Sequence, residues 1–186
     1  MSRTAPVNRL IILDRDGVIN EDSAEYVKDA EEWLPIAGSI EAIGALTRAG
    51  YRIAVATNQS GLARGFYDED ALQRMHDKLR ALSSAAGGSI DFIAVCPHGP
   101  NDGCDCRKPA PGLLTQIADY WQEDLSGVPF IGDTLRDLEA AAAAGAKPVL
   151  VRTGNGADTE RALPERFHNI DVFDDLAAAA AHFTAT

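Results

Sequence analysis

Two carboxylates directly after a short apolar segment form the first pattern that could carry out chemistry. Leu10–Leu13 is followed by Asp14 and Asp16, and Gly17 comes next. Four consecutive apolar residues are typical of a strand buried on both faces, and within a strand Asp14 and Asp16 would share the face opposite Arg15. Because glycine lets the backbone turn freely, both acids could reach one pocket. One acid could then serve as nucleophile or metal ligand while the other transfers protons. An acidic turn that merely ends a strand is the alternative.

The sequence around these acids predicts strands that alternate with helices along the chain. Apolar runs predict strands over residues 10–13, 51–56, 90–95, 128–131 and 148–151, and a short edge strand at 172–173. Apolar residues at helical spacing predict helices over residues 39–49, 111–122, 135–144 and 175–183, and one between an Asp68 N-cap and Gly87. Residues 152–169 are expected to form a loop with a helical turn. This alternation predicts an α/β fold, a three-layer doubly wound parallel sheet covered by helices on both faces.

Further polar residues are expected at the same edge of the predicted sheet as the two acids. Most of them follow two later strands or precede a helix, and one lies in the first turn of a helix; they are Thr57, Asn58, Arg107, Lys108, Asp133 and Asp137. Open α/β sheets bind ligands at the carboxyl ends of their strands, so these residues should converge with the two acids. A carboxylate can approach a phosphomonoester dianion only where a divalent cation and fixed donors neutralise the charge. Asp137 could support such a site or only contact the dipole of its helix.

The motifs DRDG, TN, KP and GDxxxD, in this order, resemble those of the haloacid dehalogenase superfamily of phosphohydrolases. The chemistry assigns Asp14 as the nucleophile that forms an aspartyl-phosphate, and Asp16 as the general acid and then the general base. The resemblance implies that Mg²⁺ is bound by Asp14, the backbone carbonyl of Asp16, and Asp133. Lys108 and the Thr57 hydroxyl would hold the phosphoryl oxygens. Each of these residues alone could be a cap or a surface charge, but together they favour an enzyme.

A cluster of soft ligands lies just before the predicted cationic pair. Its members are Cys96, His98, Cys104 and Cys106. Three thiolates and one imidazole fill a tetrahedral Zn²⁺ shell and leave no open position, which is typical of a structural site. The intervening residues 99–103 form a polar loop with no core that could bury free cysteines. An odd number of clustered cysteines also argues against a disulfide framework and for a reducing compartment. Zinc would fix this loop directly before Arg107 and Lys108.

The segments DRDGVIN, TNQSGLARG and CPH…CDCRKP resemble, more narrowly, the D-glycero-D-manno-heptose 1,7-bisphosphate phosphatases. That family removes the 7-phosphate during the synthesis of nucleotide-activated heptose for bacterial lipopolysaccharide or related glycans. The resemblance implies substrate contacts from Arg107, Asp22 and the loop formed by Thr57, Asn58, Gln59 and Ser60. Arg64 could pair with the second phosphate. Histidinol-phosphate phosphatases share the first motif, the short zinc loop and CRKP, so histidinol phosphate or another small sugar phosphate stays an alternative substrate.

Length and composition restrict the remaining classes of function. The chain has 186 residues, of which 46% are hydrophobic and 24% charged, and we expect one haloacid dehalogenase-like domain over residues 1–186 with a zinc loop at 96–106. Residues 16–57 leave no room for a large cap domain. A net charge of −11 disfavours nucleic acid as a partner and therefore a polynucleotide 3′-phosphatase. A non-catalytic, zinc-stabilised binding module would leave the acids and cations unexplained.

The expected location is the cytoplasm. No apolar run approaches the ~20 residues that span a bilayer, so we expect no membrane association. Residues 1–9 lack the apolar region of a signal peptide. No heptad pattern or long hydrophobic edge indicates an obligate oligomer, and a monomer is the expected state.

Overall fold

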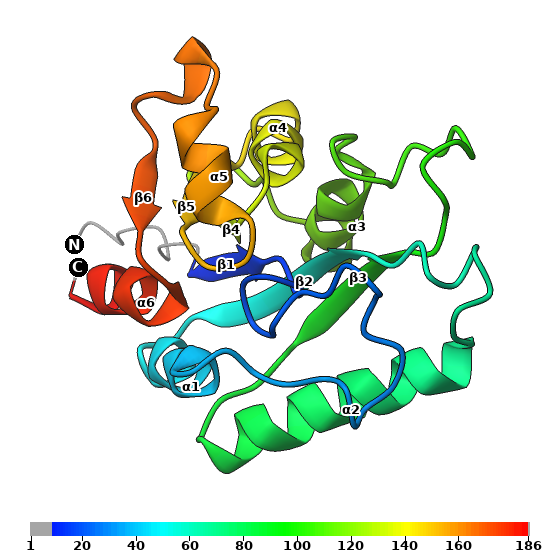
Figure 1. Cartoon of the computed structure of the whole chain (residues 1–186). Helices are drawn as coiled ribbons and strands as arrows, with labels where there is room; N and C mark the ends of the chain where they lie inside the picture. Colours follow the sequence, from blue (N-terminus) through cyan, green and yellow to red (C-terminus); the bar gives the residue numbers. More distant parts are fainter. Residues whose placement is uncertain (1–8, 186) are drawn as a thin grey trace.

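A six-stranded parallel sheet forms the centre of the protein in the computed structural model, which describes residues 9–185 (Figure 1). The strands are β1 (Leu10–Leu13), β2 (Arg52–Asn58), β3 (Phe92–Cys96), β4 (Pro129–Gly132), β5 (Lys147–Val151) and β6 (Asp171–Phe173). They are arranged in the order β3-β2-β1-β4-β5-β6, and every neighbouring pair is parallel. The predicted doubly wound parallel sheet is confirmed. Residues 1–8, nearly all of the segment without the apolar region of a signal peptide, lie outside the described residues.

Helices cover both faces of this sheet, as Figure 1 shows. One layer contains α1 (Ser39–Arg48), α2 (Glu69–Ala85) and α6 (Leu176–Thr184), and the other contains α3 (Gly112–Trp121) and α4 (Leu135–Ala143). Side chains of β1 alternate between the layers, because Ile11 and Leu13 pack in the first core while Leu10 and Ile12 pack in the second. All four are fully buried. Each contributes roughly 1.5–3 kcal/mol of hydrophobic stabilisation, so this strand is a rigid base for the residues that follow it.

The helix ends agree closely with the capping residues of the sequence. Asp68 accepts a hydrogen bond from the Ala71 N–H at 2.8 Å and begins α2, and Gly50 follows α1 with a φ of 89°. The strand predicted from Ile90 begins at Phe92 instead, since the Asp91 carboxylate accepts the Ile53 N–H at 2.8 Å before the ladder starts. The expected helical turn in residues 152–169 is α5 (Gly156–Arg161), followed by a 3₁₀ turn at Glu165–Phe167.

The chain reverses its direction across the sheet between β1 and β4. From β1 the chain adds β2 and β3 on one side, and β4, β5 and β6 extend the sheet on the other. The carboxyl ends of two such neighbouring strands leave a crevice, which is the usual ligand site of this topology. Gly17 lies in this crevice with a φ of 84°, and a Cβ there would come within 2.2 Å of the Asp133 carboxylate. Glycine is therefore required for the close approach of the two segments.

In the part of the chain that the structure describes, no helix combines the length and the apolar character needed to cross a bilayer.

Candidate active site

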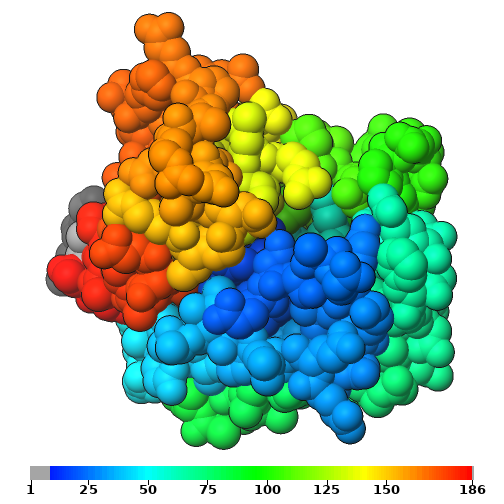
Figure 2. All heavy atoms as spheres, viewed as in Figure 1, coloured from blue at the N-terminus to red at the C-terminus, as the bar shows by residue number. Residues whose placement is uncertain are grey.

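A cavity of about 200 Å³ opens at the carboxyl ends of the central strands. Its walls come from separate parts of the chain, and the surfaces of the segment after β1 (blue) and of the α5 region (orange) meet on the face shown in Figure 2. The predicted site residues that line it are Asp14, Asp16, Asp22, Asn58, Gln59, Ser60, Arg107, Lys108, Asp133 and Asp137. The topology thus brings together nearly all the residues selected from the sequence.

Lys108 lies at the base of this cavity and is only 3% exposed. Its ammonium group lies 2.8 Å from Asp14 Oδ1 and 2.7 Å from Asp137 Oδ1, and it donates to the Ala56 carbonyl at 2.9 Å. The backbone of Lys108 is fixed as well, because its N–H donates to Asn58 Oδ1 at 3.1 Å and its carbonyl accepts from Asn58 Nδ2 at 3.2 Å. A single buried cation is therefore held rigidly between two carboxylates.

A third buried carboxylate lies close to the two that contact this cation. Oxygen atoms of Asp14, Asp133 and Asp137 lie within 4.8 Å of one another, and we call these residues together with Lys108 the carboxylate cluster. Asp133 Oδ2 accepts from the Asn155 N–H at 2.8 Å, whereas its buried Oδ1 has no hydrogen-bond partner among residues 9–185. Buried polar atoms are nearly always paired. Hard oxygen ligands, an orphaned oxygen and three negative charges against one positive charge fit a Mg²⁺ ion.

The pKa shifts in the carboxylate cluster also favour a bound divalent cation. Burial and the neighbouring Asp137 raise the pKa of Asp14 well above its usual value, even though Lys108 opposes this. Burial and Asp137 also raise the pKa of Asp133 to about 7. Against its own burial, Lys108 and the hydrogen bonds from Thr134 hold the pKa of Asp137 below its usual value. A divalent cation would favour the ionised forms of Asp14 and Asp133, because it supplies the positive charge that the cluster lacks.

Asp137 is tied to the start of α4 through its other oxygen. Asp137 Oδ2 accepts from the Thr134 N–H at 2.9 Å and from the Thr134 hydroxyl at 2.7 Å, which forms a capping box. Oδ1 faces Lys108. Asp137 therefore contacts the helix terminus and also supports the cluster, so that both uses considered for it from the sequence coexist.

Asp16 lies on a different wall of the cavity and in different surroundings. The Arg15 guanidinium donates to both of its oxygens, with Nη2 2.9 Å from Oδ1 and 3.1 Å from Oδ2. Asn20 Nδ2 and Gln59 Nε2 each donate to it at 2.8 Å. Burial alone would raise the pKa of Asp16, but the Arg15 charge and these hydrogen bonds hold it below the usual value. Strand alternation does not continue to Asp16, because β1 ends at Leu13, and Arg15 consequently folds onto the acid that it was expected to face away from.

Several predicted substrate contacts occupy distinct positions around the cavity. Asp22 is exposed and accepts from Asn155 Nδ2 at 3.1 Å, and Ser60 is buried in the wall. Thr57 is fully buried beside the lining and accepts from Gln59 Nε2 at 2.7 Å. Arg64 is the exception, since it is exposed, is absent from the lining and lies 5.8 Å from the centre of the Tyr26 ring.

The structure adds lining residues and supports that the sequence did not single out for the site. They are Arg15, Tyr26, Tyr67, His76, Arg136 and Asn155. His76 is 5% exposed, and its Nε2 lies 3.4 Å from Arg15 Nη1. Its position four residues after the buried Leu72, on the same face of the helix, was the available signal for burial. The contact with Arg15 depends on the tertiary fold and has no local signal.

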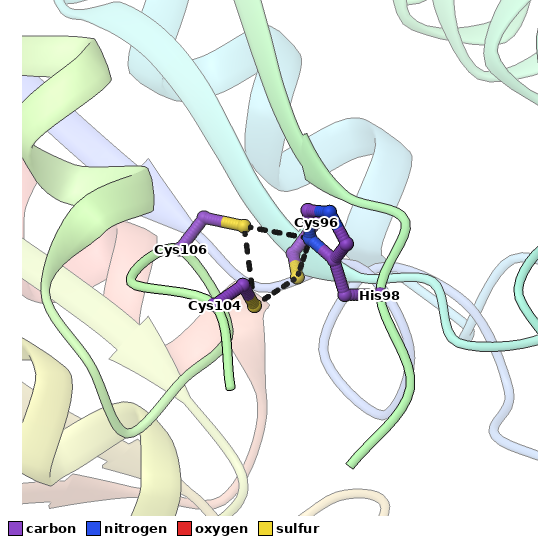
Figure 3. Close-up of side chains that lie close together, drawn as sticks. All are labelled: Cys96, His98, Cys104 and Cys106. Carbon is purple, nitrogen blue, oxygen red and sulfur yellow. Dashed lines mark hydrogen bonds between the residues drawn. The ribbon is translucent and has the colours of Figure 1, made fainter. Parts of the chain in front are cut away.

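The four soft ligands also come together, as Figure 3 shows. Cys96 Sγ lies 3.7 Å from Cys104 Sγ, and Cys104 Sγ lies 3.6 Å from Cys106 Sγ. His98 Nδ1 faces the sulfurs, 3.6 Å from Cys96 and 3.2 Å from Cys106. Zn–S bonds of about 2.3 Å in a tetrahedron place sulfur atoms about 3.8 Å apart, so these four residues fit one zinc ion. Arg107 Nη1 donates to the His98 carbonyl at 3.3 Å and thus connects this loop to the cavity.

Comparison with known proteins finds similar proteins over nearly the whole chain. The HAD-hydrolase-like family model matches residues 105–179. D-glycero-beta-D-manno-heptose-1,7-bisphosphate 7-phosphatase from Pseudomonas putida is 57% identical over 173 residues, which cover 92% of this chain and 97% of the relative. The enzyme of the same name from Bordetella bronchiseptica is 52% identical over 174 residues, covering 92% of this chain and 96% of the relative.

Solved structures agree with these sequence relatives. The crystal structure of D,D-heptose 1,7-bisphosphate phosphatase from B. bronchiseptica, complexed with magnesium and phosphate, superimposes with a TM-score of 0.91 at 51% identity and covers 95% of this chain and 98% of that one. The corresponding enzyme from Burkholderia thailandensis has a TM-score of 0.74 at 40% identity, with 96% and 99% covered. Identity over nearly the whole length shows that the chain belongs to the D-glycero-beta-D-manno-heptose-1,7-bisphosphate 7-phosphatase family of haloacid dehalogenase-like hydrolases.

Proposed function

We propose that this protein is a Mg²⁺-dependent phosphatase that removes the 7-phosphate of D-glycero-beta-D-manno-heptose 1,7-bisphosphate. The names of its relatives supply the substrate and the anomer. The observation that carries the reaction type is the carboxylate cluster, in which Asp14 lies 2.8 Å from Lys108 and beside Asp133 at the reversal point of the sheet. The product would be the heptose 1-phosphate, which retains the anomeric phosphate for nucleotide activation.

Asp14 and Asp16 divide the chemistry. An Asp14 oxygen attacks phosphorus, the bond between phosphorus and the sugar oxygen breaks, and Asp16 gives its proton to that oxygen. Asp16 then takes a proton from the water that attacks the aspartyl-phosphate, and the cleavage releases phosphate and regenerates Asp14. Arrival of a phosphoryl dianion favours protonation of Asp16 despite the Arg15 charge beside it, so the acid is supplied when substrate binds.

Charge neutralisation makes the attack feasible. Mg²⁺ would be held by the carboxylates of Asp14 and Asp133 and by the backbone carbonyl of Asp16, and when bound it neutralises phosphoryl charge. Lys108 supplies the fixed positive charge next to Asp14. The Thr57 hydroxyl would donate to a phosphoryl oxygen. Asn58 acts indirectly, because both ends of its amide hydrogen-bond the Lys108 backbone.

The sugar and its second phosphate would extend toward the opening of the cavity. Asp22 and Ser60, which line the cavity, would contact hydroxyl groups of the sugar. The Gln59 amide would support the site from behind, because both of its ends are already hydrogen-bonded within the protein. Arg107 and Arg136 line both this cavity and a neighbouring one of about 320 Å³ beside the cysteine loop. We propose these two arginines, in preference to Arg64, as the partners of the anomeric phosphate, since guanidinium groups pair well with phosphate.

The cysteine loop would hold a structural zinc ion. Its four ligands are Cys96, His98, Cys104 and Cys106, whose mutual spacing fits a closed tetrahedral shell. Metal analysis of protein purified without chelator should find about one zinc per chain, and a Cys104→Ser variant should lose it. Zinc-free wild-type protein with an ordered loop would contradict this assignment.

The proposed setting is the cytoplasm, where a reducing environment keeps the three unpaired cysteines available to zinc. The protein would act as a single domain and as a monomer on a small phosphorylated sugar. A net charge of −11 would repel nucleic acid and anionic membrane surfaces.

A substrate panel tests the proposal. Purified protein with Mg²⁺ is assayed for phosphate release from the heptose bisphosphate, histidinol phosphate and a 3′-phosphorylated oligonucleotide, and the remaining sugar phosphate is identified by NMR. We expect the highest kcat/KM for the bisphosphate and loss of the 7-phosphate only. Preference for histidinol phosphate would replace the substrate and keep the mechanism, whereas no turnover of any phosphomonoester would indicate a binding module.

A further inference from the structure

The Gln59 side chain is the centre of a buried hydrogen-bond network beside the cavity. Gln59 is 3% exposed, and its Oε1 accepts from Arg15 Nη2 at 3.1 Å and from the Tyr67 hydroxyl at 2.5 Å. Its Nε2 donates to Asp16 Oδ2 at 2.8 Å and to Thr57 Oγ1 at 2.7 Å. We call Arg15, Asp16, Gln59, Tyr67 and His76 the Gln59 network. All four hydrogen-bonding positions of the amide are occupied, two on each end.

The orientation of this amide is fixed by what surrounds it. A guanidinium group can only donate, so Arg15 requires an oxygen at the end of Gln59 that faces it. The Tyr67 phenol donates to the same oxygen at 2.5 Å, and burial raises its pKa to about 12, so that it stays protonated. A rotated amide would place its NH₂ against the guanidinium and leave the carbonyl facing the acceptor Asp16. Arg15 and Tyr67 together therefore hold the NH₂ end toward Asp16 and Thr57.

Arg15 is held in turn by His76. The Arg15 side chain is 1% exposed, and its Nη1 faces His76 Nε2 at 3.4 Å. Because the guanidinium donates, the imidazole must accept through Nε2 and carry its proton on Nδ1. Burial, and then the charge of Arg15, lower the pKa of His76 to about 3, which keeps the ring neutral. Donors and acceptors therefore alternate consistently from His76 to Gln59.

The consequence for the site concerns Thr57. Its Oγ1 accepts from Gln59, and among residues 9–185 its own proton has no acceptor. The hydroxyl proton thus has no competing acceptor, and with Thr57 directly beside the cavity lining it would be donated to a phosphoryl oxygen bound there, while Gln59 prevents Thr57 from turning its lone pairs toward the anion. Asp16 receives the second Gln59 proton and is kept in its position at the cavity wall.

We propose that Tyr67 is a positioning residue that fixes the amide of Gln59 and, through it, the side chains of Thr57 and Asp16. Nothing in the reaction requires Tyr67 to touch the substrate. Its hydroxyl acts on the groups that do, and it is supplied by the segment that leads into α2, far along the chain from Asp16. The inference rests on the proposed phosphatase activity, which wild-type turnover tests first.

A double-mutant cycle tests this role. Tyr67→Phe removes only the hydroxyl, and we expect kcat to fall about fivefold while KM changes less than twofold. Gln59→Met, which keeps the volume and removes the amide, should lower kcat by about tenfold or more. In the Gln59→Met background, adding Tyr67→Phe should change kcat by less than twofold, because the residue through which Tyr67 acts is already gone.

The matched control is Tyr51→Phe, whose hydroxyl donates to the Phe183 carbonyl at 3.1 Å at the opposite end of the sheet. It should leave kcat unchanged in both backgrounds, and the thermal midpoints of the two tyrosine variants separate structural loss from positioning. If Gln59→Met does not unfold cooperatively, Gln59→Leu serves as the background. An unchanged kcat in Tyr67→Phe, or an equal loss of kcat with and without Gln59, would overturn the inference. Failure of wild-type turnover would instead refute the proposed function.

Discussion

The two acids of the DRDG motif lie in opposite electrostatic environments, although one residue separates them. Asp14 belongs to the carboxylate cluster, in which one ammonium group contacts two of three buried carboxylates and an oxygen of the third has no partner among the described residues. Asp16 belongs to the Gln59 network, in which the guanidinium of Arg15 and two amides donate to it. The pKa of Asp14 is raised and that of Asp16 is lowered.

This contrast separates two ways in which a protein prepares a reaction. The carboxylate cluster is short of positive charge, so it becomes complete only with a cation and a phosphoryl group. The Gln59 network is already satisfied, so it fixes its members before substrate arrives, and fixed dipoles need no reorganisation during the reaction. The carboxylate cluster therefore binds the cation and the phosphoryl group, and the Gln59 network fixes the positions of the side chains beside them.

The largest expected effect is on turnover in Asp14→Asn. An amide is not a nucleophile toward phosphorus, so kcat should fall by roughly 10⁴-fold or more in an assay of phosphate release. The metal-free variant should still fold, and its thermal midpoint should not fall far, because the substitution also removes a buried charge that repels Asp133 and Asp137. Asp119→Asn, an exposed position on α3, is the matched control and should behave as wild type. Turnover close to wild type in Asp14→Asn would rule out Asp14 as the nucleophile.

Stabilisation by Mg²⁺ should distinguish the carboxylate cluster from the Gln59 network directly. At about 100 times its Kd, a ligand of the native state contributes about 2.7 kcal/mol, which corresponds to a rise of roughly 5–10 °C in the thermal midpoint of a chain of this size. Asp133→Asn should abolish the rise, and Asp16→Asn should retain it, because the Asp16 carboxylate lies outside the cluster. The measurement uses metal-depleted buffer without chelator, so that zinc stays bound.

An equal Mg²⁺-dependent rise in the thermal midpoint of Asp133→Asn and wild type would show that the cation binds elsewhere. The carboxylate cluster would then not be the cation site.

Acid should weaken the Gln59 network through His76. The pKa of His76 is about 3 in the folded protein and about 6.5 when unfolded, so the unfolded chain binds the extra proton. Stability is therefore lost as pH falls below about 6.5, by about 2 kcal/mol between pH 7.5 and pH 5. Arg15, Arg80, Asp16 and Asp77 are the charged groups that act on this ring. Urea unfolding at both pH values measures the loss.

His76→Gln provides the comparison, since the Gln Oε1 can accept from Arg15 and does not titrate. The raised pKa values of Asp14 and Asp133 affect both proteins equally and cancel in the difference. An identical pH dependence in the variant would mean that His76 is charged or exposed in the folded protein.

The sequence predicted the carboxylate cluster better than the Gln59 network, for a physical reason. Asp14, Lys108 and Asp133 come directly after a strand or before a helix of an α/β unit, and parallel topology carries all such positions to one edge. Their convergence therefore follows from element order alone. The four cysteine-loop ligands were predictable in the same way, because they are close in sequence.

The Gln59 network depends on side-chain directions that no local pattern encodes. Arg15 was expected to face away from Asp16, but β1 ends at Leu13, and beyond it alternation no longer decides the direction of a side chain. Tyr67 and His76 reach the site because α2 packs against the sheet at a particular distance and rotation. Such contacts are set by the packing of whole elements. The same holds for Arg64, which the sequence placed near a phosphate and the structure places over Tyr26.

The smallest expected effect concerns charge at the opening of the cavity. Arg136 follows the first residue of α4, is exposed and lines both cavities, so it can add positive charge without belonging to the buried cluster. Arg136→Ala should raise KM for the heptose bisphosphate about tenfold, the value of one charged contact of about 1.4 kcal/mol, with kcat unchanged. The heptose 7-phosphate lacks the anomeric phosphate, and its KM should not change. Arg64→Ala and Arg74→Ala, both exposed arginines outside the lining, are the matched controls. A larger KM in Arg64→Ala than in Arg136→Ala would indicate that Arg64, the residue inferred from the sequence, binds the second phosphate. A fall in kcat in Arg136→Ala would mean that charge at the opening of the cavity also affects the carboxylate cluster.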